Sequence, residues 1–231
     1  TTRAALDTAL HDLWGQRIGR PLREAWGLDR AQLPPSSVTV AIPRDAQQLA
    51  ACLDPLVDHP LVKLKLGSGD PAADLRAVRA ARERLAGALC VDANGAWTAE
   101  QAATLLPALH ELGLLFVEQP VADVADWRAL RAALDRPAPP LLADESVCGP
   151  ADVTRLSGLV DGINVKLAKC GGLRPAREMI RLARMHQQRV LVGCMIESSV
   201  AVSAAAQLAP LCDHADLDGN MLVRDDPFHG V

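Results

Sequence analysis

The sequence lacks three features that would assign it to a class at once: a net positive charge, a regular cysteine framework and a long apolar run. Its formal net charge is −4 over 231 residues, which leaves no basic footprint for nucleic acid or for an anionic membrane surface. The longest apolar runs, LGLLFV and VLVGCMI, are far shorter than the roughly 18 residues of a membrane-spanning helix.

The six cysteines are scattered and include no C-x-x-C pair. They therefore argue against a disulfide framework and favour buried free thiols in a reducing, cytoplasmic compartment. An initiator methionine and a signal peptide are missing from the start TTRAALDTAL, which already has a helical pattern. This start suggests that further sequence lies upstream.

Strand-like and helical segments alternate along the chain. The first segment, 2–18, has apolar residues at helical spacing and predicts an amphipathic helix. Strands are expected at 37–42, 61–66, 88–93, 114–118, 140–144, 162–166, 189–194 and 214–218, with helices at 45–57, 70–86, 99–112, 123–134, 150–157, 172–187 and 198–210. Eight strands separated by helices predict an α/β fold, a parallel (β/α)8-type barrel, and the 49% hydrophobic content can fill its core.

Charged residues interrupt the apolar stretch LVKLKL at alternate positions. Side chains alternate between the two faces of a strand, so Lys63 and Lys65 share one face and Val62, Leu64 and Leu66 share the other. Because the apolar set must pack against the helices, the lysines are expected to point toward the barrel axis.

Ionisable residues also end the next four expected strands: Asp92, Glu118, Asp144 and Lys166. Each lies about one βα unit from the one before, at the end where βα barrels build their active sites. A single carboxylate at this position is most often a helix N-cap, but several at the repeat period are harder to explain as caps. Three carboxylates without histidine or cysteine suit a hard cation such as Mg²⁺, and Asn94 could orient Asp92.

Lysines on both sides of such a metal indicate proton chemistry. A nearby divalent cation and a second lysine both disfavour the charged form of an amine, which makes a neutral base available. The metal would stabilise an enolate as it forms. Two bases across one carbon can remove a proton from one face and return one to the other, which inverts a stereocentre.

Five motifs, KLK, VDANGAW, FVEQP, LADES and VKLAKCGG, occur in this order. Together they resemble the barrel domain of the enolase superfamily, muconate-lactonising subgroup, over essentially the whole chain. The resemblance implies a modified (β/α)7β barrel with one Mg²⁺ per subunit, held by Asp92, Glu118 and Asp144. It implies Lys65 and Lys166 as the opposed acid/base pair, with Lys63 as an assistant that contacts the substrate carboxylate and with Glu145 and Lys169 as supporting charges.

Two later motifs, GCMIESS and DLDG, resemble those of dipeptide epimerases. There an aspartate pair that ends the last strand holds the ammonium group of a dipeptide, which is the role expected for Asp216 and Asp218. The alternative is a pair of turn-forming aspartates. Further substrate-binding candidates are Thr39, Cys194, Met195 and Glu197. Alternatively, Thr39 is an ordinary strand residue, Glu197 is the charge at a helix start, and Lys169 is an exposed loop lysine.

The resemblance also implies an N-terminal capping domain that this chain largely lacks. We expect residues 1–32 to be the helix and linker leading out of that domain, 33–219 to be the catalytic barrel and 220–231 to be a tail returning toward the cap. The implied reaction is epimerisation of a dipeptide, such as L-Ala-L-Glu, at the C-terminal residue's α-carbon. A cycloisomerase, an o-succinylbenzoate synthase or a cap-less inactive barrel are the alternatives, and a homo-oligomer is compatible with the sequence.

Overall fold

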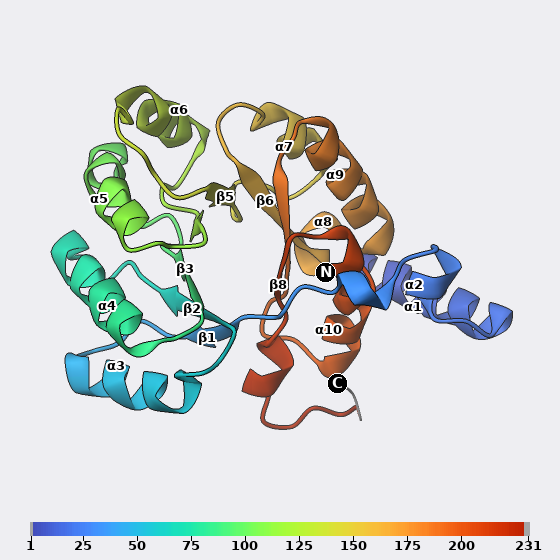
Figure 1. Ribbon diagram of the computed structural model, residues 1–231. Coiled ribbons are helices and arrows are strands. Elements are labelled where there is room, and N and C mark those ends of the chain that lie inside the picture. Colours follow the sequence, from blue (N-terminus) through green and yellow to red (C-terminus); the bar gives the residue numbers. More distant parts are fainter. Residues whose placement is uncertain (1, 229–231) are drawn as a thin grey trace. The chain divides into compact units, whose positions relative to one another are not determined.

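The computed structural model describes residues 2–228 (Figure 1); Thr1 and residues 229–231 of the expected tail lie outside the described residues. The chain divides into two compact units. One unit, called the strand β1–β5 unit, comprises Ser37–Ser146 and Gly158–Asp161. The other, called the strand β6–β8 unit, comprises the described residues up to Ser36, then Val147–Ser157, then the described residues from Gly162 onward.

The strand β1–β5 unit alternates strands and helices in the predicted order. Its strands run parallel, each paired with the next along the chain. They are β1 Val38–Val40, β2 Leu61–Lys65, β3 Ala88–Asp92, β4 Val117–Glu118 and β5 Leu141–Ala143, and the helices are α3 Ala46–Leu53, η2 Asp54–Leu56, α4 Pro71–Arg84, α5 Ala99–Glu111 and α6 Val124–Ala133.

Each helix that follows a strand in this unit starts at a side-chain cap. Asp45, Asp70, Thr98 and Asp123 accept hydrogen bonds from backbone N–H groups of the first turns of α3, α4, α5 and α6. These caps satisfy N–H groups that the helix itself leaves without partners. The N-caps are therefore different residues from the carboxylates that end strands β3 and β4.

The core of this unit packs the outer side chains of the strands against the helices. Val62 and Leu64 of β2 are fully buried, as are Trp127 of α6 and Phe116. Burial of a leucine or phenylalanine contributes about 1.5–3 kcal/mol to folding. The apolar positions of LVKLKL thus form the core side of β2, as the alternation predicts.

The strand β6–β8 unit has the same parallel arrangement. Strand β6 pairs with β7 and β7 with β8, with Lys166 opposite Gly193 and Gly193 opposite Asp216. Its elements are α1 Thr2–Ile18, α2 Leu22–Ala25, η1 Arg30–Gln32, α7 Pro150–Arg155, β6 Gly162–Lys166, α8 Leu167–Cys170, α9 Leu173–Met185, β7 Arg189–Gly193, α10 Ser199–Ala206, η3 Ala209–Leu211, β8 His214–Asp216 and η4 Gly219–Leu222.

Helix α1 leaves exposed the apolar face that its sequence pattern predicts to be buried. Its apolar residues Leu6 and Leu10 are 62% and 65% exposed, and Trp14 is also exposed. The opposite face contacts α9, where Asp7 accepts hydrogen bonds from the backbone N–H groups at the start of that helix. The amphipathic pattern therefore predicts the helix but not which side of it is buried.

Several elements are shorter than predicted. Strand β4 contains only Val117–Glu118, and β8 ends at Asp216 instead of 218. Helix α3 stops at Leu53 because Pro55, in the following 3-10 turn, lacks the N–H group that would continue the helix. Helix α8, which follows Lys166 directly, was not predicted.

Strands that alternate with helices and run parallel define the (β/α)8-type class, so the predicted fold class is confirmed. Within the described part of the chain, every helix falls short of the length and hydropathy that a bilayer crossing requires.

Candidate active site

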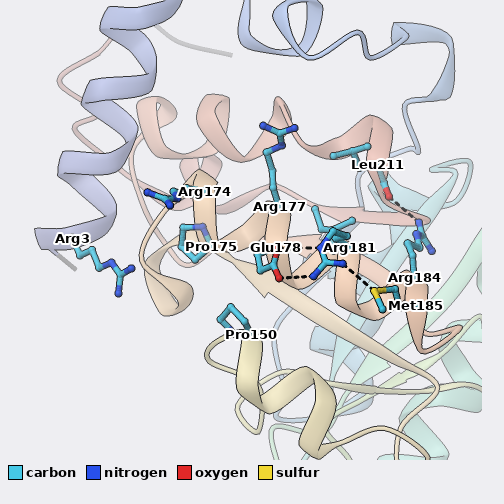
Figure 2. A pocket seen from close by; sticks show the side chains of 11 residues that line it. Arg3, Pro150, Arg174, Pro175, Arg177, Glu178, Arg181, Arg184, Met185 and Leu211 are labelled. Atoms are coloured by element: carbon cyan, nitrogen blue, oxygen red, sulfur yellow. Dashed lines mark hydrogen bonds and ion pairs between the residues drawn. The ribbon is translucent and has the colours of Figure 1, made fainter.

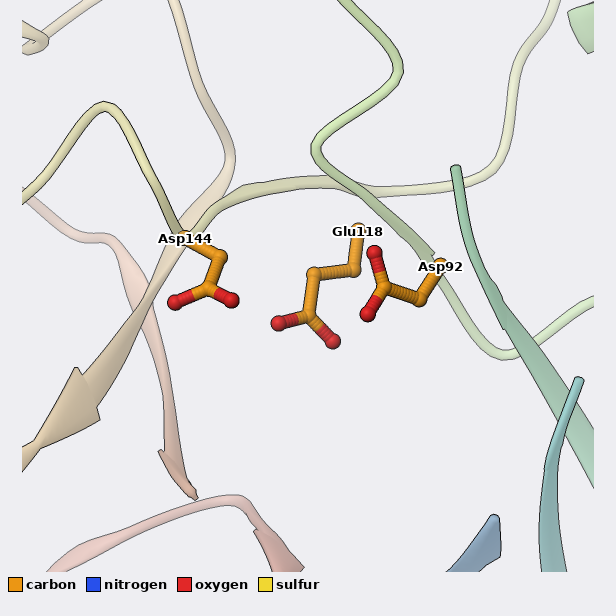
Figure 3. Close-up of side chains that lie close together, drawn as sticks. All are labelled: Asp92, Glu118 and Asp144. Carbon is orange, nitrogen blue, oxygen red and sulfur yellow. The ribbon is translucent and has the colours of Figure 1, made fainter. Parts of the chain in front are cut away.

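Three carboxylates converge at the carboxyl ends of β3, β4 and β5 (Figure 3). Asp92 and Glu118 are the last residues of their strands and face each other in the strand register, and Asp144 directly follows β5. All three are buried, and one oxygen of each lies within 4.8 Å of the others. Three like charges this close in a dry site repel one another strongly unless a cation lies among them.

Two lysines of β2 supply positive charge to this carboxylate group. The Nζ atom of Lys63 lies 3.0 Å from Glu118 Oε2 and 3.5 Å from Asp92 Oδ2. The Nζ atom of Lys65 lies 3.0 Å from Asp92 Oδ2 and 3.0 Å from Asn94 Oδ1. The side chain of Lys63 is 3% exposed, whereas that of Lys65 is 35% exposed. Lys63 is thus enclosed in ion pairs, while the Lys65 amine is open to a ligand.

Asn94 connects Lys65 to the carboxylates. Its backbone N–H donates to Asp92 Oδ1 at 3.0 Å, and its amide nitrogen donates to Asp92 Oδ2 at 3.3 Å and to Glu145 Oε1 at 3.0 Å. Its φ angle of 45° lies in the left-handed region, which asparagine tolerates better than most residues. Asn94 therefore contacts Lys65, Asp92 and Glu145 at once.

Gln119 is a site residue to which the sequence analysis gave no role, although it belongs to the quoted FVEQP motif. Its buried Oε1 accepts a hydrogen bond from the Asp144 backbone N–H at 2.8 Å, and its Nε2 donates to Ser146 Oγ at 2.6 Å and to Val121 O at 2.7 Å. These bonds join the end of β4 to the end of β5. Gln119 thus sets the spacing between the end of β4, which carries Glu118, and the end of β5, which is followed by Asp144.

Asp74 is a second residue that the sequence analysis missed. It lies in the first turn of α4, is buried, and accepts hydrogen bonds from Gly67 N and Ser68 N at 3.1 Å each and from Trp97 Nε1 at 2.9 Å. The loop that it holds follows Lys65, and Gly67 in that loop has a φ of +96° that favours glycine. Nothing in a lone aspartate of a helical segment signals this arrangement.

Lys166 ends β6 in the other unit and is buried. Asn164 lies two residues earlier on the same strand face and is fully buried. Its side chain lies against Gly193 of β7, and a Cβ atom at position 193 would come within 2.5 Å of Asn164 Oδ1. Lys169 is half-buried on α8 and donates to Asn164 O at 3.4 Å. The alternative of an exposed loop lysine at 169 is therefore wrong.

The ends of β7 and β8 are joined through a thiol. The Sγ atom of Cys194 donates to Asp216 O and accepts from the Gly219 backbone N–H, both at 3.3 Å. Burial raises the pKa of the Cys194 thiol to about 12, so the group stays protonated near neutral pH. Cys194 therefore acts in the structure as a packing residue that fixes two strand ends.

Only one member of the predicted pair Asp216 and Asp218 belongs to strand β8. Asp216 is the last residue of β8 and is buried, whereas Asp218 lies beyond the strand as the N-cap residue of η4. Because Asp218 lies outside the strand, its spacing of two residues from Asp216 does not place both side chains on one strand face. Its position must instead come from the turn that follows β8.

The remaining candidates lie on strand ends and the loop after β7. Thr39 on β1 is half-buried and is opposite Lys63 in the strand register. Met195 is exposed, and its backbone N–H donates to Glu197 Oε1 at 3.1 Å. Glu197 directly precedes Ser198, the N-cap residue of α10, and Asp226 accepts a hydrogen bond from the first backbone N–H of that helix.

The chain holds four lysines among its 24 basic residues. They are Lys63 and Lys65 of the KLK motif and Lys166 and Lys169 of the VKLAKCGG motif, so every lysine lies in one of these two motifs. The other twenty basic residues, 24 minus 4, are arginines.

Residues 45–228 match the family described as Enolase C-terminal domain-like, and the chain belongs to this family. An L-Ala-D/L-amino acid epimerase from Maribacter sp. is 40% identical over 98% of this chain and 66% of its own length. An L-Lys-D/L-Arg epimerase from Methylococcus capsulatus is also 40% identical, over 96% of this chain and 65% of its own length. This chain thus spans just under two thirds of these two relatives.

A solved structure shows the same fold. The dipeptide epimerase from Methylococcus capsulatus, complexed with Mg and the dipeptide L-Arg-D-Lys, superposes with a TM-score of 0.87 at 36% identity. The match covers 97% of this chain and 65% of that one.

Proposed function

We propose that the chain carries the catalytic site of a Mg²⁺-dependent dipeptide epimerase, which inverts the α-carbon of a dipeptide's C-terminal residue. The proposal depends on one observation: three buried carboxylates at successive strand ends, with the lysines of β2 against them. Relatives of this chain support it, because they include an L-Ala-D/L-amino acid epimerase and a dipeptide epimerase.

In the proposed site, Asp92, Glu118 and Asp144 hold one Mg²⁺. Three carboxylate oxygens without a nitrogen or sulfur donor fit a hard divalent cation. When bound, the cation supplies positive charge that stabilises the negative charge developing on the substrate carboxylate as the α-proton leaves.

Lys65 and Lys166 are the proposed bases. The partly exposed amine of Lys65 takes the α-proton from one face of the carbon, and the ammonium of Lys166 gives a proton to the other face. The reverse direction uses the same groups in exchanged protonation states, so the proton count balances over a complete cycle. Lys63 remains paired with Glu118 and Asp92, and its fixed charge offsets theirs.

The proposed substrate pocket is completed by Asp216 and Asp218, which hold the dipeptide ammonium group. Thr39, Cys194, Met195 and Glu197 are proposed to line it. Of the two relatives at 40% identity, one is an L-Ala-D/L-amino acid epimerase and the other is an L-Lys-D/L-Arg epimerase. Side-chain specificity within the dipeptide class must therefore be measured directly.

Proton exchange in D₂O tests the reaction. The wild-type chain with Mg²⁺ and a panel of L,L-dipeptides should yield epimer that carries deuterium at the C-terminal residue's α-carbon. Lys65→Ala and Lys166→Ala should each lose inversion, and each should retain exchange with only one of the two epimers, because one base remains. Inversion that survives both substitutions would contradict the two-base mechanism.

A second measurement separates this reaction from cycloisomerisation or dehydration at the same kind of site. Asp216→Asn with Asp218→Asn should weaken dipeptide binding strongly while Mg²⁺ binding stays unchanged, since the carboxylates of β3–β5 are untouched. Unchanged dipeptide affinity in this variant would remove the dipeptide assignment.

A further inference from the structure

A groove separate from the candidate active site runs along helix α9 (Figure 2). It has a volume of about 1160 Å³, and all of its lining residues belong to the strand β6–β8 unit. Apolar side chains, among them Pro150, Pro175 and Ile180, contribute to its walls. None of the residues that line this groove has a role in the proposed reaction.

Arginines form a stripe along the groove. Arg174, Arg177, Arg181 and Arg184 lie on α9 at spacings of three, four and three residues, which places them on one face of the helix. The stripe is about 15 Å long at 1.5 Å per residue. Arg3 of α1 adds a fifth guanidinium group to the lining.

Two members of the stripe have carboxylate partners and the rest do not. Glu178 forms a two-bond pair with Arg181, at 2.7 and 3.1 Å, and Asp213 lies 2.6 Å from Arg184. Arg177 stacks over the Trp26 ring at 4.5 Å. Among residues 2–228, no carboxylate lies within ion-pair distance of Arg3, Arg174 or Arg177. In a chain whose net charge is −4, the groove is a local region of uncompensated positive charge.

We propose that this groove binds an acidic, amphipathic helical segment of a partner polypeptide. A helix that carries carboxylates every three to four residues matches the arginine spacing, because both follow the helical repeat. Guanidinium groups bind carboxylates in pairs of parallel hydrogen bonds. Apolar residues on the flanks of such a segment would cover the proline and isoleucine side chains of the walls.

The same features disfavour two other occupants. A second copy of this chain, related by a two-fold axis across α9, would set arginine against arginine, and like charges opposed in an interface cost several kcal/mol. A nucleic acid would use the guanidinium groups through its phosphates but would leave the apolar walls uncovered.

Peptide binding tests the proposal on the full chain. The probe is a labelled amphipathic peptide of roughly 14 residues, about as long as α9, with glutamates at i, i+3, i+7 and i+10 and leucines beside them. Fluorescence anisotropy should show binding that weakens as salt is raised. The same peptide with glutamine in place of glutamate should bind at least about tenfold more weakly.

Matched variants locate the site. Arg174→Glu with Arg177→Glu should weaken peptide binding at least about tenfold, whereas Arg79→Glu with Arg128→Glu, an equal charge change at exposed positions of α4 and α6, should change it less than about twofold. Arg174→Glu alone leaves the Arg177–Trp26 contact intact and should still weaken binding. Circular dichroism verifies that each variant is folded.

Three results would overturn the proposal. One is equal peptide binding by the groove variants and the control variant. Another is tighter binding of a single-stranded oligonucleotide of the same charge, which would assign the groove to phosphates. The last is self-association of the chain that the groove substitutions abolish, which would assign it to a second copy.

Discussion

Replacement of Asp74 by asparagine should destabilise the chain, although the side chain keeps its size. Asp74 Oδ2 accepts hydrogen bonds from Gly67 N and Trp97 Nε1, and Oδ1 accepts one from Ser68 N. An amide can present only one acceptor oxygen, so at least one N–H group would face the NH₂ group of the asparagine. The buried position leaves water little access to replace the lost bond.

The expected loss follows from the bond count. Hydrogen bonds to a charged acceptor contribute about 1.5–3 kcal/mol each, and neutral ones about 1 kcal/mol. Exchange of three charged bonds for two neutral ones should therefore cost about 2.5–7 kcal/mol in the free energy of unfolding. For a chain of this size, each kcal/mol corresponds to about 2–4 °C in Tm.

Urea denaturation followed by circular dichroism measures this loss. Asp70→Asn is the matched control: it removes the same charge from the same helix end, and asparagine is as good an N-cap as aspartate. Trp97→Phe should cost about 1.5–3 kcal/mol through the lost hydrogen bond, because it removes a single donor to the Asp74 carboxylate. Unfolding free energies of Asp74→Asn and Asp70→Asn that agree within about 0.5 kcal/mol would refute this account.

Three further predictions concern thiol reactivity, acid stability and a close backbone contact. Iodoacetamide at neutral pH should alkylate the exposed thiols of Cys52 and Cys148 and leave Cys194, whose pKa burial raises to about 12, unmodified in the folded chain; mass spectrometry of the peptides reads this out, and fast labelling of Cys194 would contradict it. Burial raises the pKa of Asp213, but the hydrogen bonds from the Arg184 guanidinium and the Val190 backbone N–H outweigh burial and hold the pKa below its ordinary value. The stabilisation from Asp213 is therefore full above about pH 4 and is lost as the pH falls through the lower folded pKa. Asp213→Asn should accordingly destabilise the chain at pH 7 and have less effect near pH 2. Urea unfolding midpoints at the two pH values measure this difference, and an equal destabilisation at both would contradict the role given to the Asp213 charge. Gly219→Ala should cost about 1–3 kcal/mol, because its Cβ would clash with the backbone oxygen of Met195 in the loop after β7; unchanged Tm would show that this loop moves aside at little cost.

The sequence predicts the strand order and the positions of the carboxylates because both depend on periodic patterns. Alternation within LVKLKL places Lys63 and Lys65 on one face, and the repeat length places Asp92, Glu118 and Asp144 at strand ends. Parallel strands bring such ends to one edge whatever the intervening helices contain. These parts of the site need no knowledge of individual contacts.

Contacts between distant loops could not be predicted in this way. Gln119 and Asp74 each act through several side-chain hydrogen bonds that join separate loops, and no periodic pattern marks them. The position of Asp218 depends on where β8 ends, which the apolar pattern does not fix to within two residues. Helix α1 shows a different limit, because its most apolar face is the one left exposed.

The confinement of lysine to four positions makes amine chemistry a probe of the candidate site. Reductive methylation with isotopically labelled formaldehyde would modify only Lys63, Lys65, Lys166, Lys169 and the chain's own terminal amine, while the twenty arginines stay unmodified. The resulting NMR spectrum would contain few signals, nearly all from the proposed site. Their titration, and their response to Mg²⁺ or to a dipeptide, could be followed residue by residue without any substitution in the chain.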